Sequence, residues 1–467
     1  MSRLVLFTAL ALAHAQWSCS SSLPTLLVSS NHRTNAPLEA ADAIELPGPA
    51  PTDGPIAIYS NTTHVEALAG RGQALWVATR GGLEEYDIAR HARVATYTTL
   101  AGLPTLALES VTLTADGLPV VTTTRQRCTM YGPTRRFACV NHSSAMPRLP
   151  TSNATEQIEG SAVTARYQSP DGREWFGTAG LGVWERKANQ LRRLTPTQQL
   201  VGNHIVAIAE WKQTVYLANF DGGLGRLGRG QFAETVLDSH MLNDVIATPN
   251  ALYVAASDGL YESLDGEHFR RETRLTEPFV SDLAYDPQRH VLYATATNSL
   301  WELRLGTAKQ PPQSTYLPGG SHSLQAVDVS ADGTVYLATE DRGVLRRDGK
   351  HRFASFDRLT GYPSSWATDV LAIDNGSALF GSLNQGVFAI GSSLPNGFTA
   401  PNPWVLFLGR DTLDPARLFI GTQGGASLIS PNHRSDLQGL PNPCVHAITR
   451  LSSGLWVGTE GGLAQYR

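Results

Sequence analysis

The sequence repeats one pattern about every forty residues. Each copy holds a short Val/Ile/Ala-rich run, a turn built on Gly or Asp-Gly, a second run with an aromatic residue, and a Gly-Leu or Gly-Val step. The clearest copies are Ala74–Leu83, Arg173–Leu181, Thr334–Val344 and Gly454–Leu463. One such unit cannot bury its apolar faces alone, so the period predicts a radial array of small β-sheets.

The copies predict an all-β fold of four-stranded blades in a single β-propeller over residues 55–467. They centre near Trp76, Val120, Trp175, Tyr216, Tyr253, Tyr293, Tyr336, Phe380, Phe419 and Trp456. This indicates about ten blades, with eight or nine as the alternative if the weaker copies near Val120 or Phe380 are not blades. The last copy ends after its third strand, and a strand-like run, Ile56–Ser60, precedes the first copy. We expect this run to pair with the last blade and close the ring.

The bulk composition excludes several classes of protein. Hydrophobic residues make up 42% of the chain and charged residues 17%, which argues against disorder. A net charge of −4 over 467 residues predicts neither a nucleic-acid surface nor a polybasic membrane patch.

The N-terminal residues resemble an export signal over residues 1–19. Arg3 is followed by the apolar run Leu4–Ala13 and by Ala13–Ala15, which has the form of a cleavage site. This run is too short to span a bilayer, and no other segment approaches the roughly 20 apolar residues of a membrane-spanning helix. Residues 20–54 are rich in Pro, Ala, Ser and Thr and predict a flexible linker.

The four cysteines are predicted to serve three purposes. Cys19, followed by three serines, resembles the end of a bacterial lipoprotein signal, so the chain is either lipid-anchored there or secreted without a lipid. Cys128 and Cys139 flank a predicted turn symmetrically and predict a cross-strand disulfide rather than a metal pair. Cys444 is left over and is expected to be a buried apolar thiol.

The repeats resemble the two-component regulator propeller repeat. Gly439–Ile448 followed by Gly454–Leu463 carries the whole pattern, and Gly102–Pro104 with Gly361–Pro363 repeat its first part. Ala74–Leu83 and Arg417–Ala426 repeat its second part. The resemblance implies an exported sensor-like propeller. In that family the propeller is commonly joined to a transmembrane helix and a histidine kinase, and neither is expected in this chain.

One copy, Gly259–Phe269, is similar to the Asp-box hairpin of sialidases and sortilin-type receptors. That motif is a turn away from the active site, so it supports the fold and not an activity.

We expect no set of catalytic residues, no metal and no cofactor. Glu84 and Glu85 are neighbours in a strand and should point to opposite faces. His204 and His446 begin innermost strands and can face a central channel, where a solvated or hydrogen-bonded histidine is favoured over a metal ligand. Trp76, Trp175 and Trp456 are expected to be packing anchors between blades.

Two groups of surface residues suggest contacts with partners. Arg125, Arg127, Arg135 and Arg136 can recognise an acidic surface or a glycan, although a solvated edge is favoured. Acceptor sites for N-glycans occur at Asn61, Asn141, Asn153 and Asn375 and matter only in a glycosylating host.

The sequence therefore predicts a bacterial cell-envelope propeller, periplasmic, anchored to the outer membrane or extracellular. We expect a monomer that binds a protein, a peptide or a glycan through one face of the ring, with no residue assignable to the binding site. A glycan-active hydrolase or lyase that uses the channel is the alternative, and a pure assembly factor is a third hypothesis. Fold alone does not separate them.

Overall fold

The computed structural model describes residues 54–142, 156–188, 190–228, 233–238, 241–306, 311–317, 323–347, 352–374, 376–392, 394, 398–431 and 433–467. The predicted signal peptide with Cys19, residues 20–53 of the predicted linker, and the acceptor sites Asn153 and Asn375 lie outside the described residues.

The described chain is all-β, as predicted, and forms ten antiparallel sheets. Two short 3-10 turns, η1 (Thr99–Ala101) and η2 (Arg358–Thr360), interrupt the strands. No helix in the described part of the chain is both long and apolar enough to cross a membrane.

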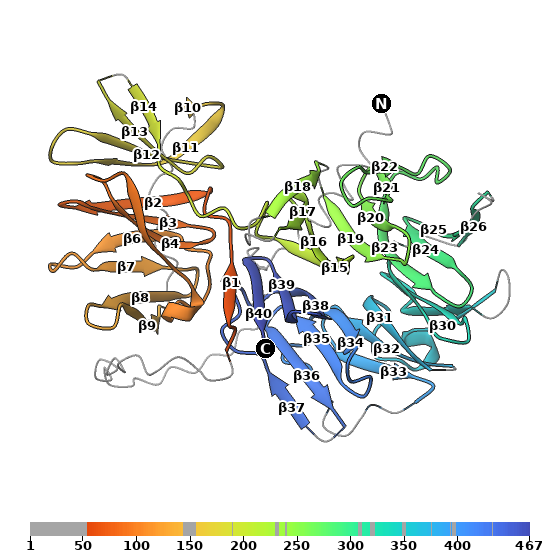
Figure 1. Ribbon diagram of the computed structural model, residues 1–467. Helices are drawn as coiled ribbons and strands as arrows, with labels where there is room; N and C mark the ends of the chain where they lie inside the picture. The colour runs from red at the N-terminus through yellow and green to blue at the C-terminus, as the bar shows by residue number, and fades with distance from the viewer. Residues whose placement is uncertain are drawn as a thin grey trace, which may run out of the picture.

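Three sheets lie together on one side of the molecule, and we call them the three-sheet group (Figure 1). The first sheet contains β2 (Val65–Arg71), β3 (Ala74–Thr79), β4 (Gly82–Asp87) and β5 (Ala92–Tyr97). The second contains β6 (Ser110–Leu113), β7 (Pro119–Thr122), β8 (Gln126–Tyr131) and β9 (Arg136–Asn141). The third contains β10 (Gln157–Ile158), β11 (Ser161–Gln168), β12 (Glu174–Thr178), β13 (Val183–Lys187) and β14 (Gln190–Arg193).

The other seven sheets form the seven-sheet group (Figure 1). Its first three sheets contain β15 (Ile205–Trp211), β16 (Thr214–Asn219), β17 (Gly223–Leu227) and β18 (Ala233–Leu237); β19 (Leu242–Ala247), β20 (Leu252–Ala256), β21 (Gly259–Ser263) and β22 (Arg270–Arg271); and β23 (Val280–Asp286), β24 (Val291–Ala296), β25 (Ser299–Arg304) and β26 (Gln313–Tyr316).

The next three sheets contain β27 (Leu324–Val329), β28 (Val335–Thr339), β29 (Val344–Arg347) and β30 (Phe353–Phe356); β31 (Ala367–Asp374), β32 (Ser377–Ser382) and β33 (Val387–Ile390); and β34 (Val405–Arg410), β35 (Leu418–Thr422), β36 (Gly425–Ser430) and β37 (His433–Asp436). The last sheet joins β38 (Val445–Leu451), β39 (Gly454–Thr459) and β40 (Gly462–Tyr466) to β1 (Ala57–Tyr59), which pairs antiparallel with β40.

The sheets are arranged differently from the predicted single ring of ten. In the seven-sheet group the first strands contact one another in the order β15, β19, β23, β27, β31, β34 and β38, and β38 contacts β15 again. In the three-sheet group β2 lies between β11 and β6. The chain leaves the seven-sheet group after β1 and returns at β15, so the three sheets between them stand beside the cycle and not within it (Figure 1).

The second strand of most sheets is buried along its whole length. In β3, β28 and β35 nearly every residue is buried, because each strand lies inside its sheet and is covered on both faces by neighbouring sheets. Strands covered in this way are near-continuous apolar runs and not alternating ones. The predicted anchors Trp76, Trp175 and Trp456 lie on such strands and are 3%, 0% and 3% exposed, which confirms their role in the core.

The Gly-Thr-x-x-Gly part of the repeat forms the turn after the second strand. In the last sheet the Thr459 hydroxyl donates to the Gly462 carbonyl at 2.8 Å and accepts from the Gly461 N–H at 3.1 Å. Gly462 has a φ of 138°, and a Cβ there would lie 2.7 Å from the Tyr59 carbonyl oxygen. The motif therefore needs glycine both for its backbone conformation and for the close approach of β1.

Two crossing segments connect the groups. The Asn61 N–H donates to Asn203 Oδ1 at 2.7 Å, and Asn203 Nδ2 donates back to the Asn61 carbonyl at 2.7 Å. The Thr62 N–H also donates to the Thr197 carbonyl at 2.8 Å. The outgoing and returning segments are thus hydrogen-bonded to each other.

A loop of the three-sheet group docks on the last sheet. The Leu106 N–H donates to the Pro441 carbonyl at 2.9 Å, and Thr99 Oγ1 donates to the Gly439 carbonyl at 2.8 Å. Leu106 itself is fully buried and packs in the apolar cluster that contains Phe419 and Val445. These contacts fix the two groups against each other.

Candidate functional site

The first strands of the seven-sheet group surround a cavity of about 500 Å³. The second residue of each of these strands lines it, and most of these residues are polar. They are Val206, Asn243, Ser281, Gln325, Thr368, Leu406 and His446.

Three of these polar side chains bridge adjacent sheets. Asn243 Nδ2 donates to the Val280 carbonyl at 2.6 Å, Ser281 Oγ to the Leu324 carbonyl at 2.7 Å, and Thr368 Oγ1 to the Val405 carbonyl at 2.8 Å. In each pair the acceptor is the first residue of the next first strand. These side chains therefore hold the sheets together as well as lining the cavity.

Four aspartates lie deeper in the same channel, and each bridges two sheets. Asp244 accepts from the Leu283 N–H at 3.2 Å, Asp282 from the Val327 N–H at 2.7 Å, Asp328 from the Ala372 N–H at 2.8 Å, and Asp369 from the Leu408 N–H at 2.6 Å. Asp244, Asp328 and Asp369 also accept the N–H of the following residue. We call these four residues the aspartate arc.

The surroundings of the aspartate arc favour protonated carboxyl groups. Burial raises the pKa of Asp328 to about 6 and the pKa of Asp369 to about 7, although backbone N–H donors act in the opposite direction. Burial also raises the pKa of Asp244 and of Asp282, and the charge of Asp244 raises the pKa of Asp282 further. Asp282 hydrogen-bonds Asp244, so the pKa of each carboxyl group depends on the protonation of the other.

Among the described residues that line the cavity, Arg410 is the one arginine, and there is no lysine. Arg410 lines the cavity, donates from Nη2 to the Ile373 carbonyl at 3.0 Å, and lowers the pKa of Asp328 by its charge. The channel therefore presents carboxyl groups on one side, a guanidinium beside them, and apolar Ala207, Phe407 and Ala447 on the remaining strands.

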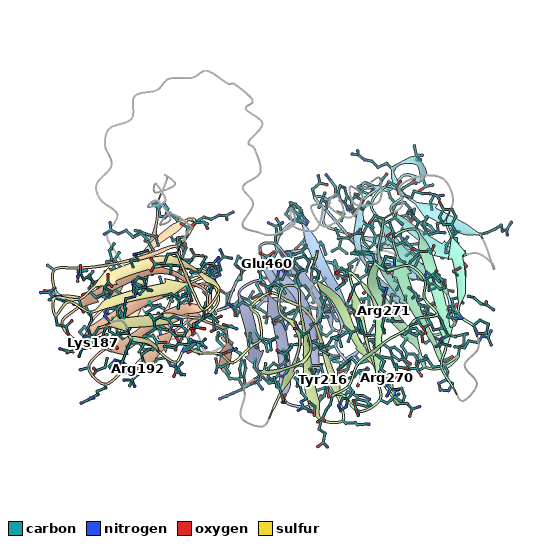
Figure 2. All side chains as sticks on the ribbon, turned by 90° about the horizontal axis from the view of Figure 1, so that it is seen from above. Lys187, Arg192, Tyr216, Arg270, Arg271 and Glu460 are labelled. Atoms are coloured by element: carbon teal, nitrogen blue, oxygen red, sulfur yellow. A yellow bond between two sulfur atoms is a disulfide. The ribbon has the colours of Figure 1, made fainter. Side chains whose placement is uncertain are left out.

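His204 and His446 meet at the mouth of this cavity. Their rings are 4.9 Å apart, and His446 Nε2 lies 3.5 Å from Glu460 Oε1. Burial, together with the charge of His446, holds the pKa of His204 well below its usual range. Glu460 lies in the turn between β39 and β40, on the side of the seven-sheet group nearest the three-sheet group (Figure 2). The prediction that both histidines face the channel holds, whereas Glu460 was missed.

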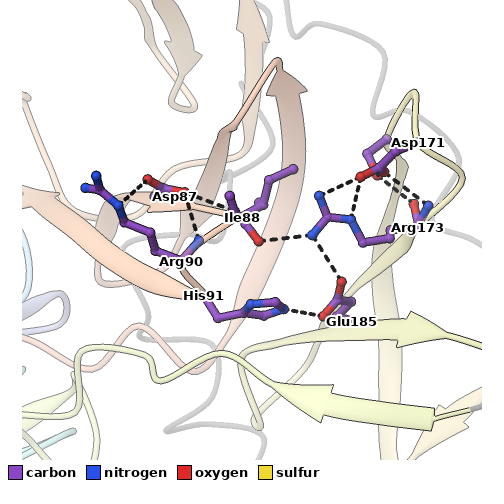
Figure 3. A network of polar contacts seen from close by, with 9 residues as sticks. Asp87, Ile88, Arg90, His91, Asp171, Arg173 and Glu185 are labelled. Carbon is purple, nitrogen blue, oxygen red and sulfur yellow. Dashed lines mark hydrogen bonds and ion pairs between the residues drawn. The ribbon is translucent and has the colours of Figure 1, made fainter.

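A second buried polar network lies in the three-sheet group, between its β2–β5 and β10–β14 sheets (Figure 3). His91 Nε2 is 2.5 Å from Glu185 Oε2, and Arg173 Nη1 is 3.4 Å from Glu185 Oε1. Arg173 also donates to the Ile88 carbonyl at 3.0 Å and to Asp171 at 2.7 Å. The hydrogen bond and charge of Asp171 raise the pKa of Arg173. Because its groups bond one another across a sheet boundary, this network has a structural role.

The cysteines differ from the predictions in one respect. Cys128 and Cys139 form a disulfide with an S–S distance of 2.08 Å. Cys444, predicted to be a free buried thiol, is fully buried but disulfide-bonded, so that prediction is wrong. Its partner sulfur lies outside the described residues, as does Cys19.

The predicted surface groups are used within the fold to different extents. Arg135 pairs with Glu85 and donates from Nε to Tyr97 Oη at 2.6 Å, so it is not a free surface cation. Glu84 instead accepts hydrogen bonds from the Tyr86 hydroxyl and the Thr197 N–H. The prediction that Glu84 and Glu85 face opposite sides of the strand is therefore confirmed.

Two other predicted surface residues also bond within the fold. Arg136 donates to the Leu100 carbonyl at 3.0 Å. Asn61 is 8% exposed and donates to the Leu200 carbonyl at 2.9 Å, so its side chain is not accessible to a glycan.

The Asp-box-like hairpin is a turn, as predicted. Asp265 accepts the N–H groups of Glu267 and His268 at 2.9 and 2.8 Å, and Gly266 has a φ of 81°. Asp265 therefore stabilises the turn, and Glu267 of the same hairpin pairs with Arg226 of the preceding sheet at 2.7 Å.

Comparison with known proteins identifies no family. No family model matches the sequence, and no curated protein matches it. The folds of several solved structures are similar over most of the chain. The extracellular domain of the putative one-component system BT4673 from B. thetaiotaomicron is 12% identical, with a TM-score of 0.47 over 86% of this chain and 69% of that one.

Two further structures give comparable values. The extracellular domain of the putative hybrid two-component system BT3049 from the same organism is 11% identical, with a TM-score of 0.48 over 85% of this chain and 60% of that one. PorZ, a surface component of the type-IX secretion system of Porphyromonas gingivalis, is 14% identical, with a TM-score of 0.45 over 86% of this chain and 73% of that one. With TM-scores below one half, these similarities carry no argument about what this chain does.

Proposed function

We propose that the seven-sheet group is a closed seven-bladed propeller and that the three-sheet group is an open arc docked beside it. The contact of β38 with β15 and the pairing of β1 with β40 support closure. An apolar cluster containing Tyr59, Ile205 and Trp456 lies between the first and last sheets of the cycle, as closure requires.

We infer that the chain works in an oxidising compartment outside the cytoplasm. All three cysteines in the described residues are in disulfides. Disulfides persist in exported proteins and are rare in the cytosol. This agrees with the export signal predicted at residues 1–19.

A lipid anchor at Cys19 remains a prediction. Cys19 is the one cysteine that the described residues do not account for, so a lipid on it and an intramolecular disulfide to Cys444 exclude each other. The intact mass of the exported chain, measured without reductant, separates the two.

The function best supported is that of a non-catalytic binding module whose propeller channel receives a polar group of a protein, a peptide or a glycan. The observation that carries this proposal is the cavity of about 500 Å³, which is within the usual size range of ligand sites. Its walls belong to hydrogen-bonded strands, so the polar groups at its mouth are held in place before a ligand arrives.

A substitution that fills the mouth tests the proposal. Leu406 lines the cavity without bridging sheets, so Leu406→Trp should block entry and leave the fold intact. Val94→Trp is the matched control, because Val94 is 57% exposed on β5 of the three-sheet group. The full-length chain and both variants would be immobilised and exposed to a solubilised envelope extract and to a glycan array.

We expect the wild type and Val94→Trp to retain the same ligand and Leu406→Trp to lose at least tenfold in affinity. Equal binding by all three proteins would place the binding site elsewhere. Absence of any ligand for the wild type would contradict the binding function itself.

The aspartate arc favours a second candidate, a glycan-active hydrolase. A protonated carboxyl group beside an ionised one is the arrangement that general acid and base catalysis requires. Against it, every member of the arc accepts a backbone N–H from a neighbouring strand, which directs its oxygen atoms toward the wall. Release of reducing sugars from envelope polysaccharides that is lost in Asp282→Asn would establish this alternative.

A further inference from the structure

Three side chains of types that can bind metals, contributed by two sheets, converge at the mouth of the channel. His204 immediately precedes β15, the first strand of its sheet, and His446 is the second residue of β38. Glu460 follows β39, where its N–H donates to the Cys444 carbonyl at 3.1 Å. The three possible ligand atoms all lie within 4.8 Å of one another.

The two imidazoles lack the hydrogen bonds that burial normally requires. Nε2 of His204 and Nε2 of His446 are both buried, and neither has a hydrogen-bond partner. The contact of His446 with Glu460, at 3.5 Å, is at the limit of hydrogen-bonding distance. Buried polar atoms without partners are costly, so two of them facing the same point indicate that something is bound there.

We propose that His204, His446 and Glu460 bind a divalent transition-metal ion of the zinc class through the two Nε2 atoms and one carboxylate oxygen. Two histidines and one carboxylate are a familiar zinc set that leaves a fourth position open. Bonds of about 2.0–2.1 Å in a tetrahedral site place ligand atoms roughly 3.4 Å apart, which is close to the separation of His446 and Glu460. All three ligand atoms lie within 4.8 Å of one another, so binding requires the His204 ring to move toward the other two.

The proposed ion would have two effects on the fold and the site. His204 belongs to the first sheet of the cycle and the other two ligands to the last, so the ion would join the sheets where the ring closes. Its open position would face the channel and can accept an oxygen atom of a bound molecule. The metal site is independent of the proposed ligand-binding function, since it concerns the free protein.

The direct test is titration of the full-length, chelator-treated chain with Zn²⁺ by calorimetry, and with Co²⁺ by visible absorption. We expect one Zn²⁺ per chain, the absorption bands of tetrahedral Co²⁺, and a higher Tm with Zn²⁺ because the ion binds the folded state. No heat and no cobalt bands in the wild type would overturn the proposal, whatever the variants do.

Substitutions assign the ligands. His204→Ala, His446→Gln and Glu460→Gln should each weaken Zn²⁺ binding by at least ~100-fold, more than the loss of an outer-shell partner. His64→Ala is the matched control, because His64 precedes β2 as His204 precedes β15 and lies 3.4 Å from Glu66. Undiminished binding in His204→Ala and His446→Gln would place the ion at other residues and refute the site.

Discussion

The two groups of sheets use one repeat but protect their ends differently. In the seven-sheet group the last sheet meets the first, and Tyr59 of β1 stacks on Trp456 with ring centroids 5.5 Å apart. In the three-sheet group the outer face of the third sheet is covered locally. The guanidinium groups of Arg166 and Arg186 lie 5.3 and 4.3 Å from the Phe176 ring.

The comparison teaches that this repeat does not impose a ring. A stack of repeats needs its terminal apolar faces covered, and either closure or capping side chains can do this. Here β10 also contributes Ile158 to the small apolar cluster that contains Phe176. A group of sheets built from this repeat can therefore fold without forming a ring if its terminal faces are covered.

The interior strands differ as well. Residues Asp244, Asp282 and Asp369 follow a register shift in their first strands, and Ala67 and Ala165 occupy the corresponding positions in the three-sheet group. The seven-sheet group therefore contains buried carboxyl groups that the three-sheet group lacks at these positions. This gives the two groups different responses to pH.

The largest expected effect comes from removing one buried tryptophan in each group. Trp175→Ala and Trp456→Ala should each lower the free energy of unfolding of their own group by about 3–5 kcal/mol, because each removes a large core side chain. Differential scanning calorimetry should show two transitions, with each variant lowering a different one. A single transition lowered equally by both variants would show that the groups unfold as one unit.

The buried network around Glu185 in the three-sheet group should give a somewhat smaller effect. Glu185→Gln removes the charge shared by His91 and Arg173 and leaves Arg173 paired only with the half-exposed Asp171, which should cost about 2 kcal/mol. Only the transition of the three-sheet group should move. As a control, Glu174→Gln should change little, since the Glu174 side chain is 46% exposed and lies 3.7 Å from Arg186. Equal effects of the two substitutions would contradict the structural role of Glu185.

The smallest change in stability, taken for one carboxyl group and one pH unit, is a pH dependence confined to the seven-sheet group. The pKa of Asp282 is raised well above its usual value and that of Asp369 to about 7, so the folded group binds protons that the unfolded chain releases. Stability should therefore fall as pH rises from about 5 to 7, by up to about 1.4 kcal/mol per pH unit for each carboxyl still protonated in the folded state.

The three-sheet group should not share this trend. The pKa of Glu66 and of Asp171 is lowered, so their contribution is complete above pH 5 and is lost only in acid. Calorimetry at pH 5, 6 and 7 measures both transitions. Asp282→Asn, which mimics the protonated carboxyl, should flatten the slope of the seven-sheet group, and an unchanged slope would contradict the assignment to Asp282.

The sequence predicted local features well because the repeat encodes them locally. The all-β class, the buried tryptophans and the Asp-Gly turns all depend on neighbouring residues. Gly117, Gly172 and Gly333, for example, have φ values of 82°, 83° and 88°, as the Asp-Gly turns require.

The arrangement of the sheets could not be predicted in the same way. Which sheets are neighbours depends on contacts between distant segments, such as Leu106 with Pro441 and Asn61 with Asn203. The glycine and aromatic positions that define the repeat are the same in copies of both groups. The count of ten units was therefore read as a ring of ten.

The site was predicted only in part. His204 and His446 were placed at the channel from their position at strand starts. Glu460 was missed because, although it follows His446 in the same sheet, its approach to His204 depends on the contact between the last and first sheets. The aspartate arc had a visible signal, an Asp followed by Val or Leu near the start of a first strand, as in Asn243–Val245, Ser281–Leu283 and Thr368–Val370. Cys444 was predicted to be a free thiol because its disulfide joins segments that the repeat does not relate.

The most direct test of the account is hydrogen exchange of the β1 amides in the native full-length chain, followed by mass spectrometry. A closed seven-bladed ring requires Ala57–Tyr59 to be held between the first and last sheets through β40. We therefore expect a peptide containing β1 to be protected as strongly as one containing β39. Exchange of β1 as fast as that of an unstructured peptide, with β39 still protected, would show that the ring is open and contradict the account.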